Sequence, residues 1–175
     1  MVYLITTKIN FMKKLLFITG ILLMSTFSFA QTYQHAIGLK GLSPHNPFSG
    51  GGINFKTFIG GSNALDITLG GGNNHLTGQL LYEWQRPTGW TDGFDWYLGV
   101  GGTLGAWNNG NHWHDHDYDD GFFLNADAVI GLDFNILPNT NIPLGFAVEA
   151  GPSIGIINSR SFGLSSAVAV RYIIK

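Results

Sequence analysis

The chain has 175 residues, only 11% of them charged, and it contains no cysteine. The missing cysteines exclude disulfides, Cys-ligated zinc, iron–sulfur clusters and thiol nucleophiles, and the charged fraction is far below the roughly 25% of typical soluble domains. The formal net charge of −2 hides an asymmetry, because three lysines precede residue 30 and all the acids lie beyond residue 60; the part after the leader is therefore acidic, which argues against nucleic acid as a partner.

The first 30 residues have the pattern of a cleaved secretory signal peptide. Met12-Lys13-Lys14 is a positive start, residues 15–24 are an apolar run, and Ser28-Phe29-Ala30 is a small-x-small cleavage site. The apolar run is too short for a transmembrane helix, which needs about 20 residues, so a membrane anchor is the weaker alternative. Met12 is the possible true start, with residues 1–11 as an extension. The folded domain is expected to be residues 31–175.

Beyond residue 30 the apolar residues recur at every second position, which predicts strands and no helix. In the last segment Phe162, Leu164, Val168, Val170, Tyr172 and Ile174 share one parity. The second segment is the least regular, because Phe58 falls on the polar parity. The eight predicted strands are residues 33–42, 53–59, 64–69, 76–84, 94–104, 122–136, 144–156 and 162–174.

Clusters rich in Gly, Pro, Asn, Asp and Ser separate these segments, which predicts turns between successive strands. A transmembrane strand takes about 9–11 residues, so eight strands with their turns suit residues 31–175. The predicted fold is all-β: an eight-stranded antiparallel up-and-down transmembrane β-barrel.

Charge decides which face of the strands points inward. All charged residues within the predicted segments stand on the same face as the small and polar residues, and the opposite face is apolar. The charged residues are Lys40, Lys56, Asp66, Glu83, Asp95, Asp127, Asp133, Glu149 and Arg171. An eight-stranded lumen is only just wide enough for side chains, so the small, charged face should be inside and the bulky face should meet lipid. Buried charges need partners, which predicts an interior network of Lys40, Lys56, Asp66, Glu83, Asp127, Glu149 and Arg171. The rival is a soluble periplasmic lipocalin-like barrel that binds an apolar ligand.

The aromatic residues set the orientation. An even-stranded barrel has both termini on one side, normally the periplasm. With that orientation, seven aromatic residues should form an outward-facing periplasmic girdle: Tyr33, Tyr82, Trp84, Phe94, Trp96, Phe134 and Tyr172. The longest connection, residues 108–121, then lies outside the cell. The turn at residues 86–93 is rather long for the periplasmic side.

That outer connection carries the most unusual stretch of the sequence, where His and Asp alternate. Imidazole with carboxylate suits zinc, copper or nickel, and carboxylate alone suits calcium. The candidate metal ligands are His112, His114, His116, Asp115 and Asp117. A solvated acidic loop is the simpler interpretation, and a site for an extracellular partner is a third. No other cofactor is expected.

Several stretches resemble small outer-membrane barrels of the OmpX/OmpA type, especially a branch from diderm bacteria. They are the leader ending in Phe29-Ala30-Gln31, Leu81-Tyr82-Glu83-Trp84, the run from Trp96 to Gly102, and Ile130-Gly131-Leu132-Asp133-Phe134. The resemblance implies a location among outer-membrane lipid and insertion by the barrel-assembly machinery. That machinery is thought to read an aromatic residue at the end of the last strand. Here Tyr172 is followed by Ile173-Ile174-Lys175, which departs from the family pattern.

The sequence favours a non-catalytic barrel with a structural or surface-interaction role, which we expect to be a monomer. The main rival is a lipid A-modifying enzyme, because one such deacylase barrel is similar in size. That type carries a lipid-facing His-x-Ser pair, and no His-x-Ser occurs in this chain. Glu83, Asp127, Glu149 and Arg171 could be catalytic or line a polar pore, but pairing with one another is the favoured role in a packed lumen.

Overall fold

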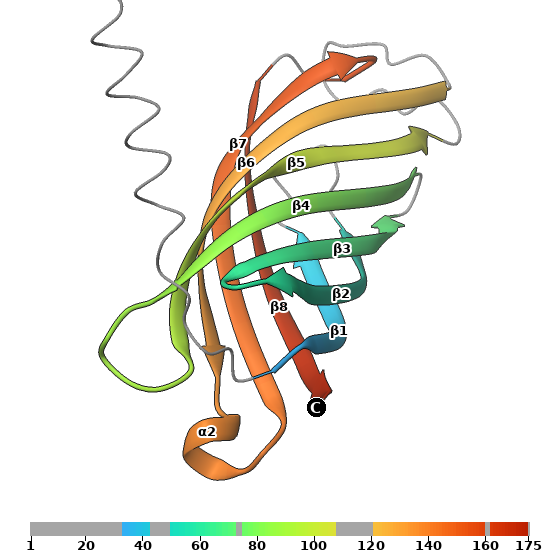
Figure 1. The fold of residues 1–175 in the computed structure, drawn as a ribbon. Coiled ribbons are helices and arrows are strands. Elements are labelled where there is room, and N and C mark those ends of the chain that lie inside the picture. Colours follow the sequence, from blue (N-terminus) through green and yellow to red (C-terminus); the bar gives the residue numbers. More distant parts are fainter. Residues whose placement is uncertain (1–32, 43–49, 73–74, 108–120, 160–161, 175) are drawn as a thin grey trace, which may run out of the picture. The chain divides into compact units, whose positions relative to one another are not determined.

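The computed structural model describes residues 33–42, 50–72, 75–107, 121–159 and 162–174. Eight antiparallel strands close into a barrel in sequential order (Figure 1). This confirms the prediction of an all-β, eight-stranded antiparallel up-and-down barrel. The strands are β1 (His35–Leu42), β2 (Gly50–Gly60), β3 (Asn63–Gly72), β4 (His75–Pro87), β5 (Phe94–Trp107), β6 (Gly121–Asn135), β7 (Leu144–Ile157) and β8 (Gly163–Ile174).

Alternation in the sequence becomes alternation of exposure in the structure. Along β8, Arg171 and Ile173 are buried, whereas Val170, Tyr172 and Ile174 are exposed. The strand is paired on both sides, with β1 and with β7, so the buried face can only be the lumen side. Because the side-chain period of a strand is two residues, this register places every second residue of β8 inside the barrel.

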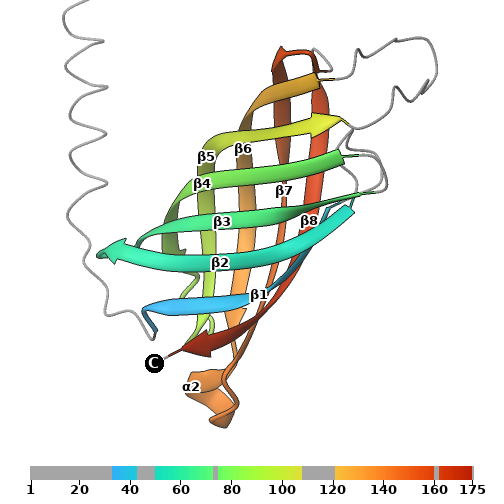
Figure 2. The same cartoon turned by 90° about the vertical axis from the view of Figure 1, so that its right-hand side faces the viewer.

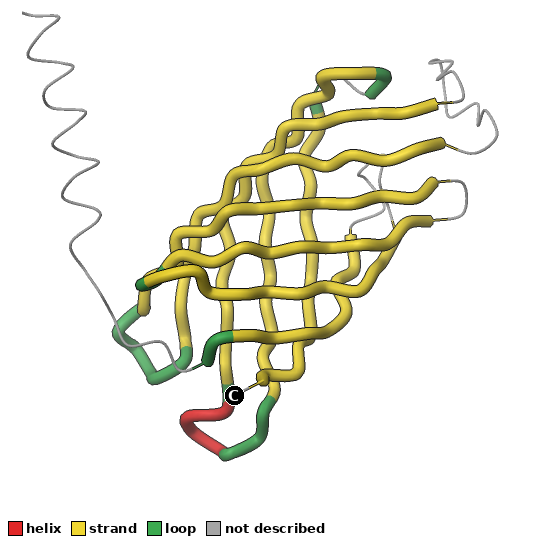
Figure 3. The backbone as a smooth tube through the Cα atoms, turned by 45° about the vertical axis from the view of Figure 1, so that its right-hand side comes forward, coloured by secondary structure: helices red, strands yellow, loops and turns green. Residues whose placement is uncertain are grey.

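The barrel has two distinct ends. The terminal end holds the start of β1, the end of β8 and the connections β2–β3, β4–β5 and β6–β7 (Figure 2). The opposite end, called the loop end below, is where β1, β3, β5 and β7 finish. Strands on the near side of the barrel cross those behind them (Figure 3), as strand tilt in a closed barrel requires.

A single turn of helix interrupts the all-strand pattern at the terminal end. The helix α2 (Leu137–Thr140) lies in the β6–β7 connection, which the sequence predicted only as a turn. Proline stands at its first turn, and Asn141 ends it with a left-handed backbone of φ 61°, a conformation that asparagine tolerates better than most residues. No helix within the described ranges is long and apolar enough to cross a membrane.

Strand length differs around the barrel wall. The strands β1 to β3 have 8, 11 and 10 residues, whereas β4 to β7 have 13 to 15.

The strand β4 continues beyond its predicted end to Pro87 and pairs Arg86 with Trp96. Arg86 was predicted to start a turn, so the structure corrects that boundary and places its charge on the barrel wall.

Candidate functional site

Arg171 lies at the centre of a group of buried charges inside the barrel. One guanidinium nitrogen, Nη2, is 2.6 Å from Asp66 Oδ2, and Nη1 is 3.2 Å from Asp133 Oδ2. The third donor, Nε, bonds Asn54 Oδ1 at 2.5 Å. The planar guanidinium fork can serve several acceptors in fixed directions, so one residue of β8 joins side chains of β2, β3 and β6 across the lumen.

Two lysines extend the group. Lys40 Nζ is 2.6 Å from Glu149 Oε1 and 3.3 Å from Asp66 Oδ1. Lys56 Nζ is 2.7 Å from Glu83 Oε2 and 2.8 Å from Asp133 Oδ2. Four carboxylates are thus bridged by three cations, and each of these side chains is at most 5% exposed. Removing one member of such a group would leave its partners buried with less compensating charge.

Tyr97 fastens the group to the barrel wall. Its hydroxyl donates to Glu149 Oε2 at 2.7 Å, and Lys56 Nζ lies 4.8 Å from the centre of its ring. The ring lies against the backbone of Gly131, where a Cβ would stand 2.3 Å from Tyr97 Cζ. Only glycine at residue 131 therefore leaves the phenol in this position.

Replacing Gly131 by alanine is expected to displace the Tyr97 ring and to lower the free energy of unfolding by about 1–3 kcal/mol, the scale of overpacking in a core. Gly145→Ala is the matched control, because a Cβ at Gly145 finds its nearest atom at 3.7 Å. Urea unfolding of the two variants, folded in lipid vesicles, measures the difference. Equal stability of both variants would contradict the position assigned to the Tyr97 ring.

Asp127 departs from its predicted pairing with a cation. Its carboxylate accepts hydrogen bonds from Thr103 Oγ1 at 2.5 Å, Ser153 Oγ at 2.6 Å and Gln79 Nε2 at 3.3 Å. Hydroxyl and amide donors stabilise the buried carboxylate in place of a cation. Gln79 also accepts a bond from Lys40 Nζ at 3.2 Å, so Asp127 joins the charged group through a neutral side chain.

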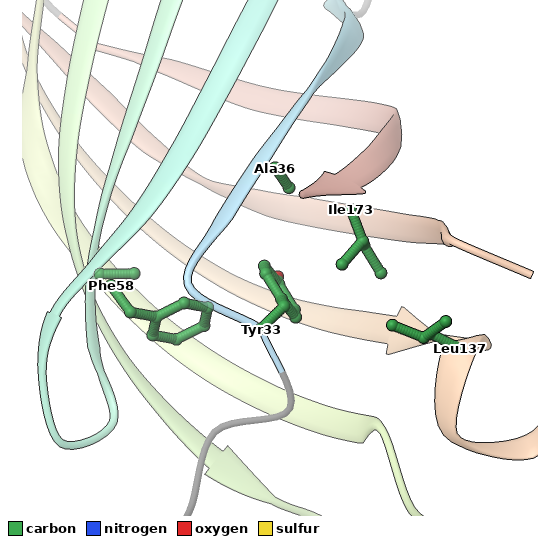
Figure 4. Packing of buried hydrophobic residues seen from close by; sticks show 6 residues of the cluster. Tyr33, Ala36, Phe58, Leu137 and Ile173 are labelled. Atoms are coloured by element: carbon green, nitrogen blue, oxygen red, sulfur yellow. The ribbon is translucent and has the colours of Figure 1, made fainter. Parts of the chain in front are cut away.

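A cluster of buried, mainly apolar side chains lies at the terminal end (Figure 4). Tyr33 is buried here, with its ring centre 5.1 Å from that of Phe58, and the turn α2 contributes Leu137. The prediction that Tyr33 belongs to the outward-facing girdle is therefore wrong. The reason is local: β1 begins only at His35, so the strand alternation does not extend back to Tyr33 and the chain is free to enter the barrel mouth.

The other six residues of the predicted girdle lie on outward-facing positions of their strands, mostly in the halves near the terminal end. Tyr82 and Trp84 pack edge to face at 4.9 Å between ring centres. Phe94 and Phe134, which are paired across β5 and β6, do so at 5.7 Å. Trp96 pairs with Leu132, and Tyr172 is 55% exposed. Trp90 was not predicted as a girdle member; it packs on Phe94 from the β4–β5 connection.

The predicted metal ligands His112, His114, His116, Asp115 and Asp117 lie outside the described residues. Within the ranges that the structure describes, no three His, Asp or Glu side chains are placed to hold a metal ion. Asp133, Asn54 and Tyr97 were not included in the predicted interior network, although the structure places them in it. Asp133 and Tyr97 stood on the polar parity of their segments, so alternation alone could have included them.

The arrangement packs the middle of the lumen with side chains that bind one another. Each of the four bridged carboxylates has a cation within 3.3 Å, and Asp127 is held by neutral donors. Such pairing compensates the cost of burying charges in a narrow interior. The middle of the lumen is thus a packed core made of paired polar and charged side chains.

Comparison with known proteins supports the fold alone. No protein-family model matches the chain, and no curated protein matches it. Among solved structures, the chain is similar to the N-terminal β-barrel domain of Pseudomonas aeruginosa OprF, with a TM-score of 0.61 and 12% identity. The match covers 82% of this chain and 100% of that domain. The chain therefore has the β-barrel architecture of that domain.

Proposed function

We propose that this chain is an integral outer-membrane β-barrel with a structural or surface-interaction role and no catalytic activity. One observation carries the proposal: polarity is inverted relative to a soluble barrel. Charged side chains fill the lumen, and large apolar side chains face outward on every strand, among them Leu39, Ile53, Leu69, Leu76, Val100, Ile130, Val148 and Val168.

Physical chemistry connects this inversion with a bilayer. Soluble proteins expose apolar residues singly and rarely in continuous patches above a few hundred Å². A closed barrel pairs all its backbone polar groups between strands, which is the requirement for sheet structure in hydrocarbon. The aromatic side chains near the terminal end match the interfacial girdle of such barrels.

The soluble rival, a barrel with an apolar ligand in its lumen, requires the opposite arrangement. Its lumen would be apolar, whereas here Lys40, Lys56, Asp66, Glu83 and Arg171 are buried at 2% exposure or less. Both termini are placed in the periplasm by this proposal, and the His/Asp-rich connection at the loop end is exposed outside the cell. That connection is where we propose that a divalent cation or an extracellular partner binds.

A gel test separates the two classes. The full chain is expressed in a diderm host, and its outer membranes are extracted and run unboiled and boiled. We expect a membrane-extracted band that changes mobility on boiling, because a closed barrel resists detergent until it is heated. A heat-insensitive band in the soluble periplasmic fraction would contradict the proposal.

A further inference from the structure

Arg86 is the only charged residue at an outward-facing position of the described strands. It follows Trp84 on the outer face of β4 and pairs with Trp96 of β5. Its Nη1 donates to Gln85 O at 2.8 Å, which holds the guanidinium at the end of the strand. A charge on a lipid-facing wall costs least at the membrane interface, and the adjacent tryptophans mark that level.

A groove of about 360 Å³ lies on the same wall, nearer the loop end. It runs over β3 to β6 and is lined by Leu65, Leu80, Tyr82, Val100, Gly102 and Leu124. Gly102 faces outward without a side chain, so the wall is hollowed between its larger neighbours. Apart from the phenol of Tyr82, these side chains are apolar, which suits a hydrocarbon chain.

The groove and the Arg86 guanidinium lie along one row of outward-facing side chains on β4. Leu80, Tyr82, Trp84 and Arg86 are successive outward residues of β4. At about 3.3 Å per residue, Tyr82 and Arg86 are roughly 13 Å apart along the strand. One leaflet of hydrocarbon is about 15 Å deep, so a lipid with its phosphate at Arg86 can reach the groove with an acyl chain. Trp84 lies between Tyr82 and Arg86 on this row, where the glycerol of such a lipid would pass.

We propose that this face of β4 and β5 is a binding site for one anionic phospholipid, with the phosphate on Arg86 and an acyl chain in the groove. Charge complementarity selects an anionic head group, since a guanidinium forms forked hydrogen bonds to phosphate oxygens. The site rests on the proposed function, because only a barrel in a bilayer meets phospholipid along its wall.

The test uses the signal-processed chain folded in detergent and presented with equimolar phosphatidylglycerol and phosphatidylcholine of identical acyl chains. Native mass spectrometry then counts the lipids retained. We expect about five-fold preference for phosphatidylglycerol, the scale of one basic residue at an anionic surface. Arg86→Gln should abolish the preference, and Arg86→Lys should keep it. Equal retention of both lipids by the unaltered protein, or an unchanged preference in Arg86→Gln, would overturn the proposal.

A second pair of variants tests the groove. Val100 lines it and is 46% exposed, whereas Val148 is 49% exposed on β7, away from the groove. Val100→Phe should fill the groove and lower the retention of both lipids severalfold. Val148→Phe should leave lipid retention unchanged. Equal loss of lipid retention in the two variants would overturn the site. So would a mass spectrum in which two copies of the chain associate and no lipid is retained. Heat-modifiable migration is measured on the same samples, so that loss of lipid preference in an intact membrane barrel refutes this site without refuting the proposed function.

Discussion

Replacing Arg171 by methionine is expected to lower the free energy of unfolding by about 3–5 kcal/mol, the usual cost of removing one partner from a buried ion group. Arg171 is 2% exposed and donates hydrogen bonds to Asp66, Asp133 and Asn54. Methionine has a similar length, so the change removes charge and hydrogen bonds with little loss of volume. The carboxylates would be left facing each other with fewer cations between them.

Urea unfolding of the barrel in lipid vesicles, followed by tryptophan fluorescence, measures this loss. Arg171→Lys keeps the positive charge but lacks the planar guanidinium. Its free energy of unfolding should therefore lie between those of Arg171→Met and the unaltered chain. Val170→Ala is the control on the neighbouring outward position, which is 44% exposed. A loss below about 1 kcal/mol in Arg171→Met, the range of exposed ion pairs, would mean that the lumen is hydrated and that the network contributes little.

Replacing Ile130 by arginine is expected to destabilise the membrane-inserted barrel by about 2–4 kcal/mol, the cost of arginine on a lipid-facing wall near the bilayer centre. Ile130 is 58% exposed in the middle of β6. Ile142→Arg makes the same exchange at a residue that is 48% exposed in the connection after α2. It should cost about 0–1 kcal/mol, because the side chain is at the interface.

The difference between the two isoleucine variants distinguishes lipid from water around the barrel. In a soluble protein, arginine at either exposed position would change stability by less than about 0.5 kcal/mol. The same vesicle-based unfolding measures both variants. Equal and small effects would contradict the assignment of the apolar face to the bilayer, whatever the gel mobility of the protein.

Strand alternation was enough to predict most of the fold. Because side chains in a strand alternate strictly, a single charged residue such as Glu149 settles the direction of its whole segment. Even the irregular Phe58 follows this rule: its place on the polar parity was an early sign that it faces the lumen, where the structure buries it against Tyr33.

The errors arise where strands end or where partners lie far apart in sequence. Tyr33 and Arg86 stand at strand boundaries, and the alternation does not show where pairing stops. The choice of partners depends on barrel register: Lys56 and Asp133 are 77 positions apart, and no local pattern relates them. For the same reason Asp127 was expected to meet a cation, although the register gives it Thr103 and Ser153.

The place of Arg171 in the last strand has a consequence for the order in which the barrel can assemble. Its partners Asn54 and Asp66 are 117 and 105 positions earlier in the chain. A partly assembled sheet that lacks β8 holds the carboxylates of β3 and β6 without this cation, so those groups must stay hydrated until β8 docks on β1. Contacts of such long sequence separation form slowly, because the loop-closure entropy is lost before they contribute. Closure of the wall and dehydration of the lumen are therefore one late, cooperative event, and a chain that stops short of β8 remains open to water on its charged face.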